Sequence, residues 1–259
     1  MRYILFFIVI IFSCARSFAA FSVLVPTPAS PLIYQVNGPT ITLTLTCVGD
    51  GVFDEPIEYF DFSALDTSIY FDVANNTCAA PLLAGNSCTL DITPKPAATL
   101  PVLTTIPIMY RSDTDDFPVP LNMEFAILQV GDAWQGGTIY EISQAPNANA
   151  TGTTVIPNVS NGPWDLNNCI NFTGGGQNNW VMPTMSQLNT IWPLSNCNAG
   201  VVGGFSCASN VFYWSSEQLL PPPPTNDGSV YIQVKNFGRN CNGADKNIHS
   251  HQTPCVRTF

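Results

Sequence analysis

Two histidines and one acid lie close together near the C-terminal end and could bind a metal ion or respond to pH. His249 and His251 alternate in "IHSH", and Asp245 precedes them. Alternation places both imidazoles on the same side of a strand. Imidazole and carboxylate groups bind zinc, and imidazole changes its charge near neutral pH. The cluster therefore allows metal ligands or a pH-sensitive pair. The simpler hypothesis, a pair of exposed loop histidines, is the one we adopt, so we expect no metal and no cofactor.

Basic residues are rare and gather late in the sequence. Lys235, Arg239 and Lys246 fall in one short stretch, and Arg257 lies near the end of the chain, whereas the chain as a whole has a formal charge of −10. Such an acidic protein should be repelled by nucleic acid and by anionic membrane surfaces. We therefore predict that these four residues form the ligand-binding site and bind sulfate or carboxylate groups of a glycan. The alternative for Arg257 is a structural role.

The motifs of common catalytic sites are missing. The sequence contains no Gly-x-Ser-x-Gly, and "TGGGQ" lacks the Lys-Ser/Thr of a phosphate-binding loop. Asp115 and Asp116 are adjacent, which indicates a solvated turn or a weak calcium site. We predict that the protein is not an enzyme.

The first residues, "MRYILFFIVIIFSCARSFAA", have the features of a secretory signal. A basic start precedes a short apolar run and the small-residue sequence ending at Ala19. No later run reaches about 18 apolar residues, so we expect residues 1–19 to be removed and no transmembrane segment to remain. The protein should be secreted or held at the cell surface. Lipid anchoring at Cys14 is the alternative.

Residues 20–128 have the pattern of an all-β domain. In "ITLTLTCV" the apolar residues and the threonines alternate strictly. Ile69, Phe71 and Val73 alternate in "SIYFDV", and "VPLNMEFAIL" repeats the period. Short alternating strands separated by proline and glycine indicate a β-sandwich.

One stretch of this domain, "VANNTCAAPLLAGNSCTLDITPKP", resembles the bacterial immunoglobulin-like repeats. In those repeats a cysteine, a Leu-Ala-Gly turn and a second cysteine precede a strand and a proline. The resemblance implies an immunoglobulin-like sandwich and a disulfide between Cys78 and Cys88.

The composition changes near Gln129, where residues rich in Gly, Asn, Ser and Trp begin. Pro163 occupies a plausible first helical position in "GPWDLNNCI". In "TMSQLNTIWP", Thr184 and Gln187 form a capping-box pattern and Pro193 should end the helix. "VYIQVKNF" indicates a strand. We therefore expect residues 129–259 to form a second domain of mixed α+β class.

Four ordered motifs of this second part resemble the C-terminal domain of the Lcl collagen-like adhesin family. They are "QGGTIY", "NNWVMPT", "YWSS" and "CVR". The resemblance implies a C-type-lectin-like fold, in which Trp180, Pro183, Tyr213 and Trp214 are structural framework. The sequence departs from the family pattern at Val181, where an arginine is usual, and we expect apolar packing there.

The resemblance also implies a disulfide between Cys169 and Cys255, because lectin-like domains often lock their termini together. Cys197 and Cys207 are close in sequence and should close a local loop. Cys241 then remains, and we pair it with Cys47 across the domain boundary, although sequence alone leaves this pairing open.

The function implied by the resemblance is extracellular binding without catalysis, as in an adhesin that recognises a glycan or a host or matrix surface. Two alternatives stay open. The protein could be a structural component of a bacterial surface assembly, or an enzyme built on a C-type-lectin-like fold.

Overall fold

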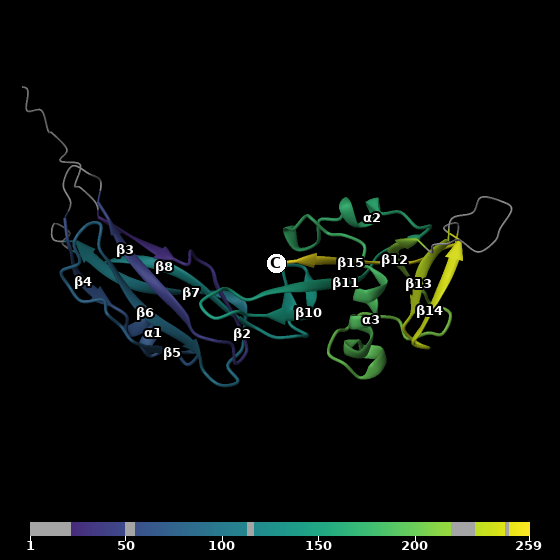
Figure 1. Cartoon of the computed structure of the whole chain (residues 1–259), viewed down its shortest axis with the longest axis horizontal. Coiled ribbons are helices and arrows are strands. Elements are labelled where there is room, and N and C mark those ends of the chain that lie inside the picture. The colour runs from purple at the N-terminus through teal and green to yellow at the C-terminus, as the bar shows by residue number, and fades with distance from the viewer. Residues whose placement is uncertain (1–21, 50–54, 113–116, 219–230, 247–248) are drawn as a thin grey trace, which may run out of the picture.

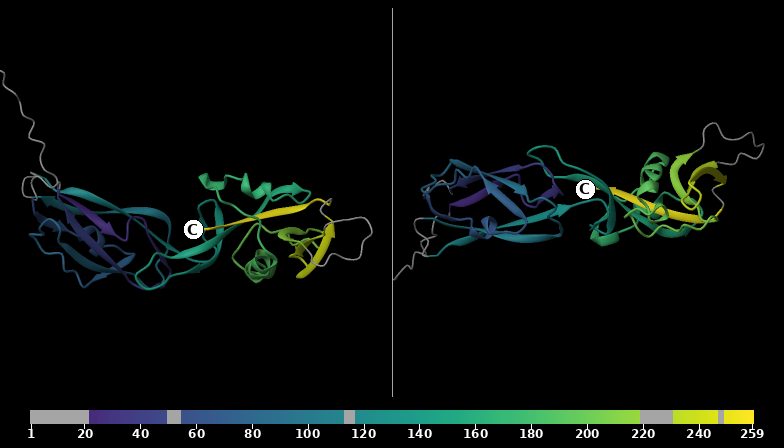
Figure 2. Two further views of the ribbon diagram at one scale, coloured as in Figure 1. Left: turned by 45° about the horizontal axis from the view of Figure 1, so that its top comes forward. Right: turned by 90° about the horizontal axis from the view of Figure 1, so that it is seen from below.

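The computed structural model describes residues 22–49, 55–112, 117–218, 231–246 and 249–259. The chain is elongated, with one group of strands at each end and the C-terminus between them (Figure 1). Two further views show the same division (Figure 2). Among the described segments, no helix is both long and apolar enough to cross a membrane.

The first group contains eight strands and one short helix. Their bounds are β1 Val23–Thr27, β2 Leu32–Gln35, β3 Ile41–Val48, β4 Ile57–Asp61, α1 Ser63–Asp66, β5 Phe71–Ala74, β6 Ser87–Pro94, β7 Leu100–Ser112 and β8 Val119–Leu128. They form two four-stranded sheets, of order β1-β3-β6-β5 and β2-β8-β7-β4. One core of buried side chains, from Leu24 to Ile127, draws on the strands of both sheets. Two four-stranded sheets around one core agree with the predicted all-β sandwich.

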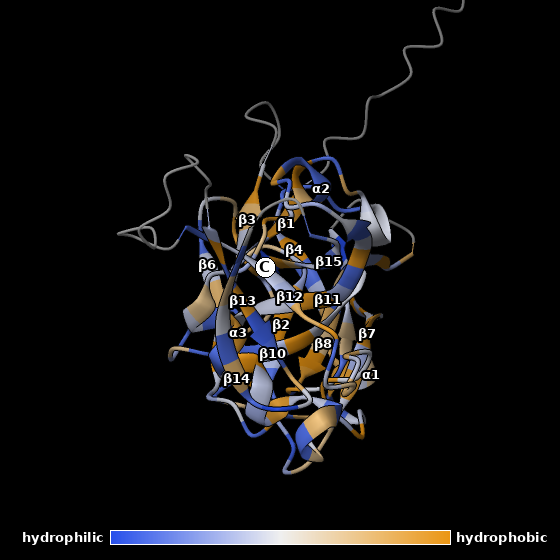
Figure 3. Cartoon of the chain, turned by 90° about the vertical axis from the view of Figure 1, so that its right-hand side faces the viewer, coloured by the Kyte–Doolittle hydropathy of each residue, from blue (hydrophilic) through white to orange (hydrophobic). Residues whose placement is uncertain are grey.

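Strand β3 shows how the sequence builds the sandwich. Its buried residues are Ile41, Leu43, Leu45 and Cys47, and the intervening threonines are half-buried on the other face. Figure 3 displays such alternation as orange and blue bands along the strands. One of the predicted alternations is incomplete, because Ile69 precedes β5 and is 75% exposed.

The second group contains seven strands, two α-helices and two 3-10 turns. Their bounds are β9 Ala133–Trp134, β10 Gly137–Ser143, β11 Thr151–Gly162, α2 Asn167–Ile170, η1 Gly174–Gly176, α3 Met185–Leu194, η2 Asn196–Asn198, β12 Tyr213–Gln218, β13 Tyr231–Asn236, β14 Cys241–Lys246 and β15 His251–Thr258. The strands form one sheet of order β14-β13-β12-β15-β11-β10-β9.

This sheet is covered on both faces. Tyr213 and Val256 pack with Leu188 and Ile191 of α3, whereas their neighbours Trp214 and Cys255 belong to a separate cluster with Cys169 of α2. Successive side chains of a strand point to opposite faces, so the two clusters lie on opposite sides of the sheet. The sheet is therefore the centre of the second group.

The expected C-terminal α+β domain with a C-type-lectin-like fold is wrong. Among the described residues of this part, α-helix is limited to the four residues of α2 and the ten of α3, against seven strands in the sheet. The sequence hid these strands because β11 and β14 are rich in Thr, Asn and Gly, which obscure a period of two. Half-exposed and edge strands need no regular apolar alternation.

The helix boundaries differ from expectation in two places. Helix α2 begins at Asn167, so Pro163 precedes it and is not its first residue. Helix α3 has the predicted capping box between Thr184 and Gln187, but it ends at Leu194, one residue after Pro193. Pro193 has no N–H to donate to the preceding turn, and its position one residue before the end of the helix limits the loss to a single helical hydrogen bond.

Three disulfides are present: Cys78–Cys88, Cys169–Cys255 and Cys197–Cys207. All three were predicted, and they indicate an oxidising environment. The expected pairing of Cys47 with Cys241 is wrong. Cys47 is buried in the sandwich and Cys241 is exposed on β14, in the other sheet group, so the two sulfurs are not joined.

The two groups meet through a small apolar cluster and a loop. Leu128, Trp134 and Ile139 pack together there with Ile33 and Phe259. The loop between β10 and β11 lies on the sandwich and hydrogen-bonds to the backbone of β2 through Gln144 and Asn149. The junction is thus packed rather than a bare linker.

Candidate functional site

An open depression lies at the end of the large sheet where β11 ends and β15 begins. Its volume is about 400 Å³. We call it the amide depression, and its lining residues are Asn161, Asn210, Val211, Phe212, Ser250, His251 and Gln252. Three separate segments supply these residues, and the sheet brings them together. Tyr213 of β12 lies beside Gln252 of β15 in parallel register, and Asn161 of β11 lies opposite Gln252 in antiparallel register.

The amide side chains of this depression are available to a ligand. Within the part of the chain that the structure describes, the side chains of Asn161, Asn210 and Gln252 make no hydrogen bond. Each amide can accept through its oxygen and donate through its nitrogen. Phe212 is half-buried beside them and offers an apolar ring. Planar amides around an aromatic ring are suited to a ligand with many hydroxyl groups and an apolar face.

His251 forms one wall of the depression and is held firmly. Its Nε2 lies 2.6 Å from Oδ2 of Asp245, and its side chain is 10% exposed. Its ring centroid is 4.5 Å from that of Trp214 and 5.4 Å from that of Phe212. Packing and hydrogen bonding together fix the orientation of this imidazole.

The structure brings the two histidines and Asp245 together. His249 Nε2 lies 3.5 Å from Oδ1 of Asp245, while His251 contacts Oδ2 of the same carboxylate. We call these three residues the histidine–aspartate cluster. Among the described residues, no group of His, Cys, Asp and Glu could hold a metal ion. Each imidazole here faces a different carboxylate oxygen, so the three groups do not converge on one point as tetrahedral ligands must.

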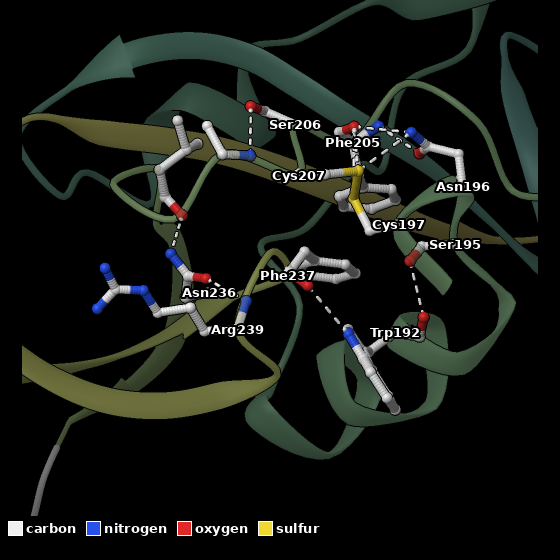
Figure 4. The surroundings of a disulfide bond; sticks show 12 residues. Trp192, Ser195, Asn196, Cys197, Phe205, Ser206, Cys207, Asn236, Phe237 and Arg239 are labelled. Atoms are coloured by element: carbon white, nitrogen blue, oxygen red, sulfur yellow. Dashed lines mark hydrogen bonds between the residues drawn. A yellow bond between two sulfur atoms is a disulfide. The ribbon is translucent and has the colours of Figure 1, made fainter. Parts of the chain in front are cut away.

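A disulfide-braced loop supports the wall that carries Asn210 and Phe212 (Figure 4). The Cys197–Cys207 disulfide closes the loop, and the Asn196 side chain exchanges two hydrogen bonds with the backbone of Phe205. The Phe205 ring stacks on Phe237 with centroids 4.3 Å apart.

The same wall is tied to β13 through a buried amide. Asn236 Nδ2 donates to the carbonyl oxygens of Ser209, at 3.1 Å, and of Val211, at 2.8 Å. These residues flank Asn210, so the position of Asn210 is set by β13 and not by the loop alone.

The aromatic motif residues are framework, as expected. Trp180, Tyr213 and Trp214 are fully buried, and Trp214 Nε1 donates to the Gly162 carbonyl at 3.0 Å. The expected apolar packing of Val181 is wrong. Its side chain is 51% exposed, and only its backbone pairs, with Val256 of β15.

The four predicted ligand-binding residues do not form one surface. Lys235 is 3% exposed, and burial lowers its pKa. Its Nζ donates to Asn240 Oδ1 at 2.8 Å and lies 5.6 Å from the centre of the Trp192 ring. Arg239 is exposed in the turn after β13, and its guanidinium points away from the disulfide in Figure 4.

The other two basic residues lie elsewhere. Lys246 is the last residue of β14, at the opposite end of the hairpin from Lys235, and its side chain is outside the described structure. Arg257 lies near the far end of β15, where Nη1 donates to Gln135 Oε1. This hydrogen bond agrees with the structural role that was the alternative for Arg257. A binding role for the four residues stays a prediction.

Several expectations fall outside the described residues. They are the signal segment 1–19 with Cys14, and the acidic pair Asp115 and Asp116. The amide depression was not predicted from the sequence, because Asn161, Asn210 and Gln252 belong to no motif. The one available signal was the abundance of asparagine beside aromatic residues after Gln129.

No family model matches this chain, and no curated protein matches it.

Proposed function

We propose that this chain is an exported, non-catalytic binding protein that recognises a glycan through the amide depression. The observation that carries the proposal is the group of three unoccupied amide side chains around Phe212 and His251. Sugar hydroxyls donate and accept hydrogen bonds, as amides do, and the apolar face of a sugar ring can stack on an aromatic side chain. The open shape of the depression suits the end or side of an extended saccharide.

Export is supported by two independent features. The three disulfides need an oxidising compartment, and the N-terminal sequence has the pattern of a secretory signal. We propose that the protein acts outside the cell or on its surface.

The N-terminal part is proposed to be an immunoglobulin-like spacer for the binding part. Its strand order, β1-β3-β6-β5 packed on β2-β8-β7-β4, resembles the two sheets of immunoglobulin domains when the first strand is divided between them. The Cys78–Cys88 disulfide agrees with the resemblance to bacterial immunoglobulin-like repeats. An adhesin-like role, as the Lcl resemblance implies, fits a binding surface carried at the end of a second domain.

A non-catalytic role is supported by the surroundings of His251. In the described structure its side-chain contacts are Asp245, His249 and two aromatic rings, and none of them is a hydroxyl or thiol that a histidine base would activate. A histidine acting as a general base must lie within hydrogen-bonding reach of the group that it activates.

The test is binding of the purified mature chain to an array of neutral, carboxylated and sulfated oligosaccharides. The double variant Asn161→Ala/Asn210→Ala should weaken binding of any positive glycan. Each lost hydrogen bond contributes about 0.5–1.5 kcal/mol, so we expect roughly a fivefold to hundredfold rise in Kd. Asn122→Ala, which changes an exposed asparagine of the sandwich, is the matched control.

Two outcomes would contradict the proposal. One is that no glycan on the array binds. The other is that binding survives the double variant but is lost in Arg239→Ala/Lys246→Ala, which would place the site on the basic residues predicted from the sequence.

A further inference from the structure

We propose that the histidine–aspartate cluster makes the amide depression pH-sensitive, so that it binds a carboxylated glycan more tightly at acidic than at neutral pH. This inference rests on the proposed function, because it concerns the charge beside the same depression. It adds the class of ligand and the condition under which binding is strongest.

His251 connects the two features. Its ring lines the depression, while its Nε2 is engaged by Oδ2 of Asp245 at 2.6 Å. A change in the protonation of the cluster therefore changes the charge at the wall of the depression. His249, whose Nε2 lies 3.5 Å from the other oxygen of Asp245, shares this carboxylate.

Among the described residues, the titratable groups in contact with His251 are Asp245 of β14 and His249 of the preceding segment. Strand β12 and the residue before it present uncharged rings, those of Trp214 and Phe212. Strand β11 places a glycine opposite His251. Protonation of the two imidazoles is thus the change in charge that acidification produces at this wall.

The sign of the effect follows from the charges. With neutral imidazoles the cluster carries the negative charge of Asp245, which repels a ligand carboxylate. Histidine side chains ordinarily gain a proton between about pH 8 and pH 5. The first proton neutralises the cluster and the second makes it positive, which attracts a carboxylate. A neutral hydroxyl group both donates and accepts, so its binding changes little.

The size of the effect is modest because the depression is open to water. A charge interaction at an exposed site contributes up to about 1 kcal/mol, which is roughly a fivefold change in Kd for each charge. With two protons gained, we expect a carboxylated glycan to bind about 5-fold to 20-fold more tightly near pH 5 than near pH 7.5.

The experiment uses the mature chain and two matched probes. One is an oligogalacturonide, and the other is the same oligosaccharide after chemical reduction of its carboxylates to alcohols. The ligand carboxylates stay ionised above about pH 4.5. Kd is measured by titration calorimetry near pH 5 and near pH 7.5, at constant ionic strength and with EDTA to exclude metal effects. The acid enhancement should appear for the oligogalacturonide and stay below about twofold for the reduced probe.

Two variants and one spectroscopic measurement locate the switch. His251→Gln keeps a donor toward Asp245 without a titratable ring, and should remove most of the pH dependence. His249→Gln removes one of the two protonating rings and should reduce the pH dependence by about half. The chain has two histidines, so their NMR signals can be followed separately through a pH titration. Asp245→Asn removes the negative charge of the cluster, so the oligogalacturonide should bind more tightly near pH 7.5 than it binds to the wild type.

The failures of the two proposals are distinguishable. Binding of the oligogalacturonide with equal Kd at both pH values would overturn the switch and leave glycan binding standing. An equal acid enhancement for the reduced probe would also overturn it, since the effect would not then depend on ligand charge. Unchanged binding of the oligogalacturonide to Asp245→Asn near pH 7.5 would overturn it as well, even if His251→Gln fails to fold. Failure of every glycan on the array would instead overturn the proposed function.

Discussion

Replacing Asn149 by alanine should loosen the junction between the sandwich and the large sheet. Asn149 Oδ1 accepts from the Ile33 backbone N–H at 3.0 Å, and its Nδ2 donates to the Pro31 carbonyl at 3.1 Å. Ile33 lies in β2, an edge strand whose other side pairs with β8. The asparagine therefore satisfies backbone groups that a strand partner would otherwise occupy.

The expected cost follows from these two bonds. A hydrogen bond contributes about 0.5–1.5 kcal/mol, and a partly buried group left without a partner costs about 1–3 kcal/mol. We expect Asn149→Ala to lower the free energy of unfolding by about 2–3 kcal/mol. Asn149→Asp should be no less costly, since it keeps the acceptor for Ile33 but turns a carboxylate oxygen toward the Pro31 carbonyl. Asn147→Gly is the control and should cost below about 1 kcal/mol, because it removes only exposed bonds to Thr42 and glycine tolerates the φ of +58° at this position.

The assay is equilibrium unfolding in urea, with hydrogen exchange as the local probe. The Ile33 amide should exchange faster in Asn149→Ala than in wild type, whereas core amides such as that of Leu43 should change only with global stability. The reasoning would be refuted by an Asn149→Ala variant as stable as Asn147→Gly, or by unchanged protection of the Ile33 amide.

Three further predictions concern the second part of the chain. Cys169→Ala/Cys255→Ala should lower the free energy of unfolding in urea by about 4–5 kcal/mol, because this disulfide spans 86 residues. Removal of the Cys197–Cys207 disulfide, which spans 10 residues, should cost about 3 kcal/mol. Equal costs would contradict the argument from loop entropy. Gly136→Ala should lower the melting temperature clearly, since φ is +90° and a Cβ would meet the Gly174 backbone at 2.6 Å, whereas Gly162→Ala has open space and should not. Burial raises the pKa of Tyr140 to about 12, so the folded state keeps its proton after the unfolded state loses it near pH 10. The stability should therefore fall between about pH 10 and pH 12, and the urea midpoint of Tyr140→Phe should fall less over the same range.

The sandwich could be predicted because its information is local. Each strand such as "ITLTLTCV" buries alternate residues against one core, so a period of two is visible in the sequence itself. The Cys197–Cys207 disulfide was predictable because its cysteines are close in sequence, whereas the Cys78–Cys88 disulfide followed from the resemblance to immunoglobulin-like repeats. The capping box of α3 needs only Thr184 and Gln187, three residues apart, and it too was predicted correctly.

The class of the second part could not be predicted, because its strands lack that period. Strand β11 is bulged between Ile156 and Ser160, and β12 is bulged between Trp214 and Gln218. At each place four residues of one strand oppose two of its partner, so two extra residues interrupt the regular alternation and the strand is hard to recognise in the sequence. The family resemblance identified buried aromatic residues correctly, but those residues are compatible with more than one fold.

The buried aromatic framework could be recognised in the sequence, whereas the amide depression beside it could not. Tyr213 and Trp214 are fully buried and belong to a recognisable motif, while Phe212, one residue earlier, lies at the surface and lines the depression. Trp214 supports His251 from within, and His251 presents its ring to the depression. The histidine–aspartate cluster was partly predictable, since its members are neighbours in sequence, but its partner amides come from positions 161 and 210, which only the sheet brings near. Burial selects large aromatic residues that a sequence pattern can reveal. A surface depression of asparagine and glutamine depends on where three strands meet, and that is a property of the tertiary structure alone.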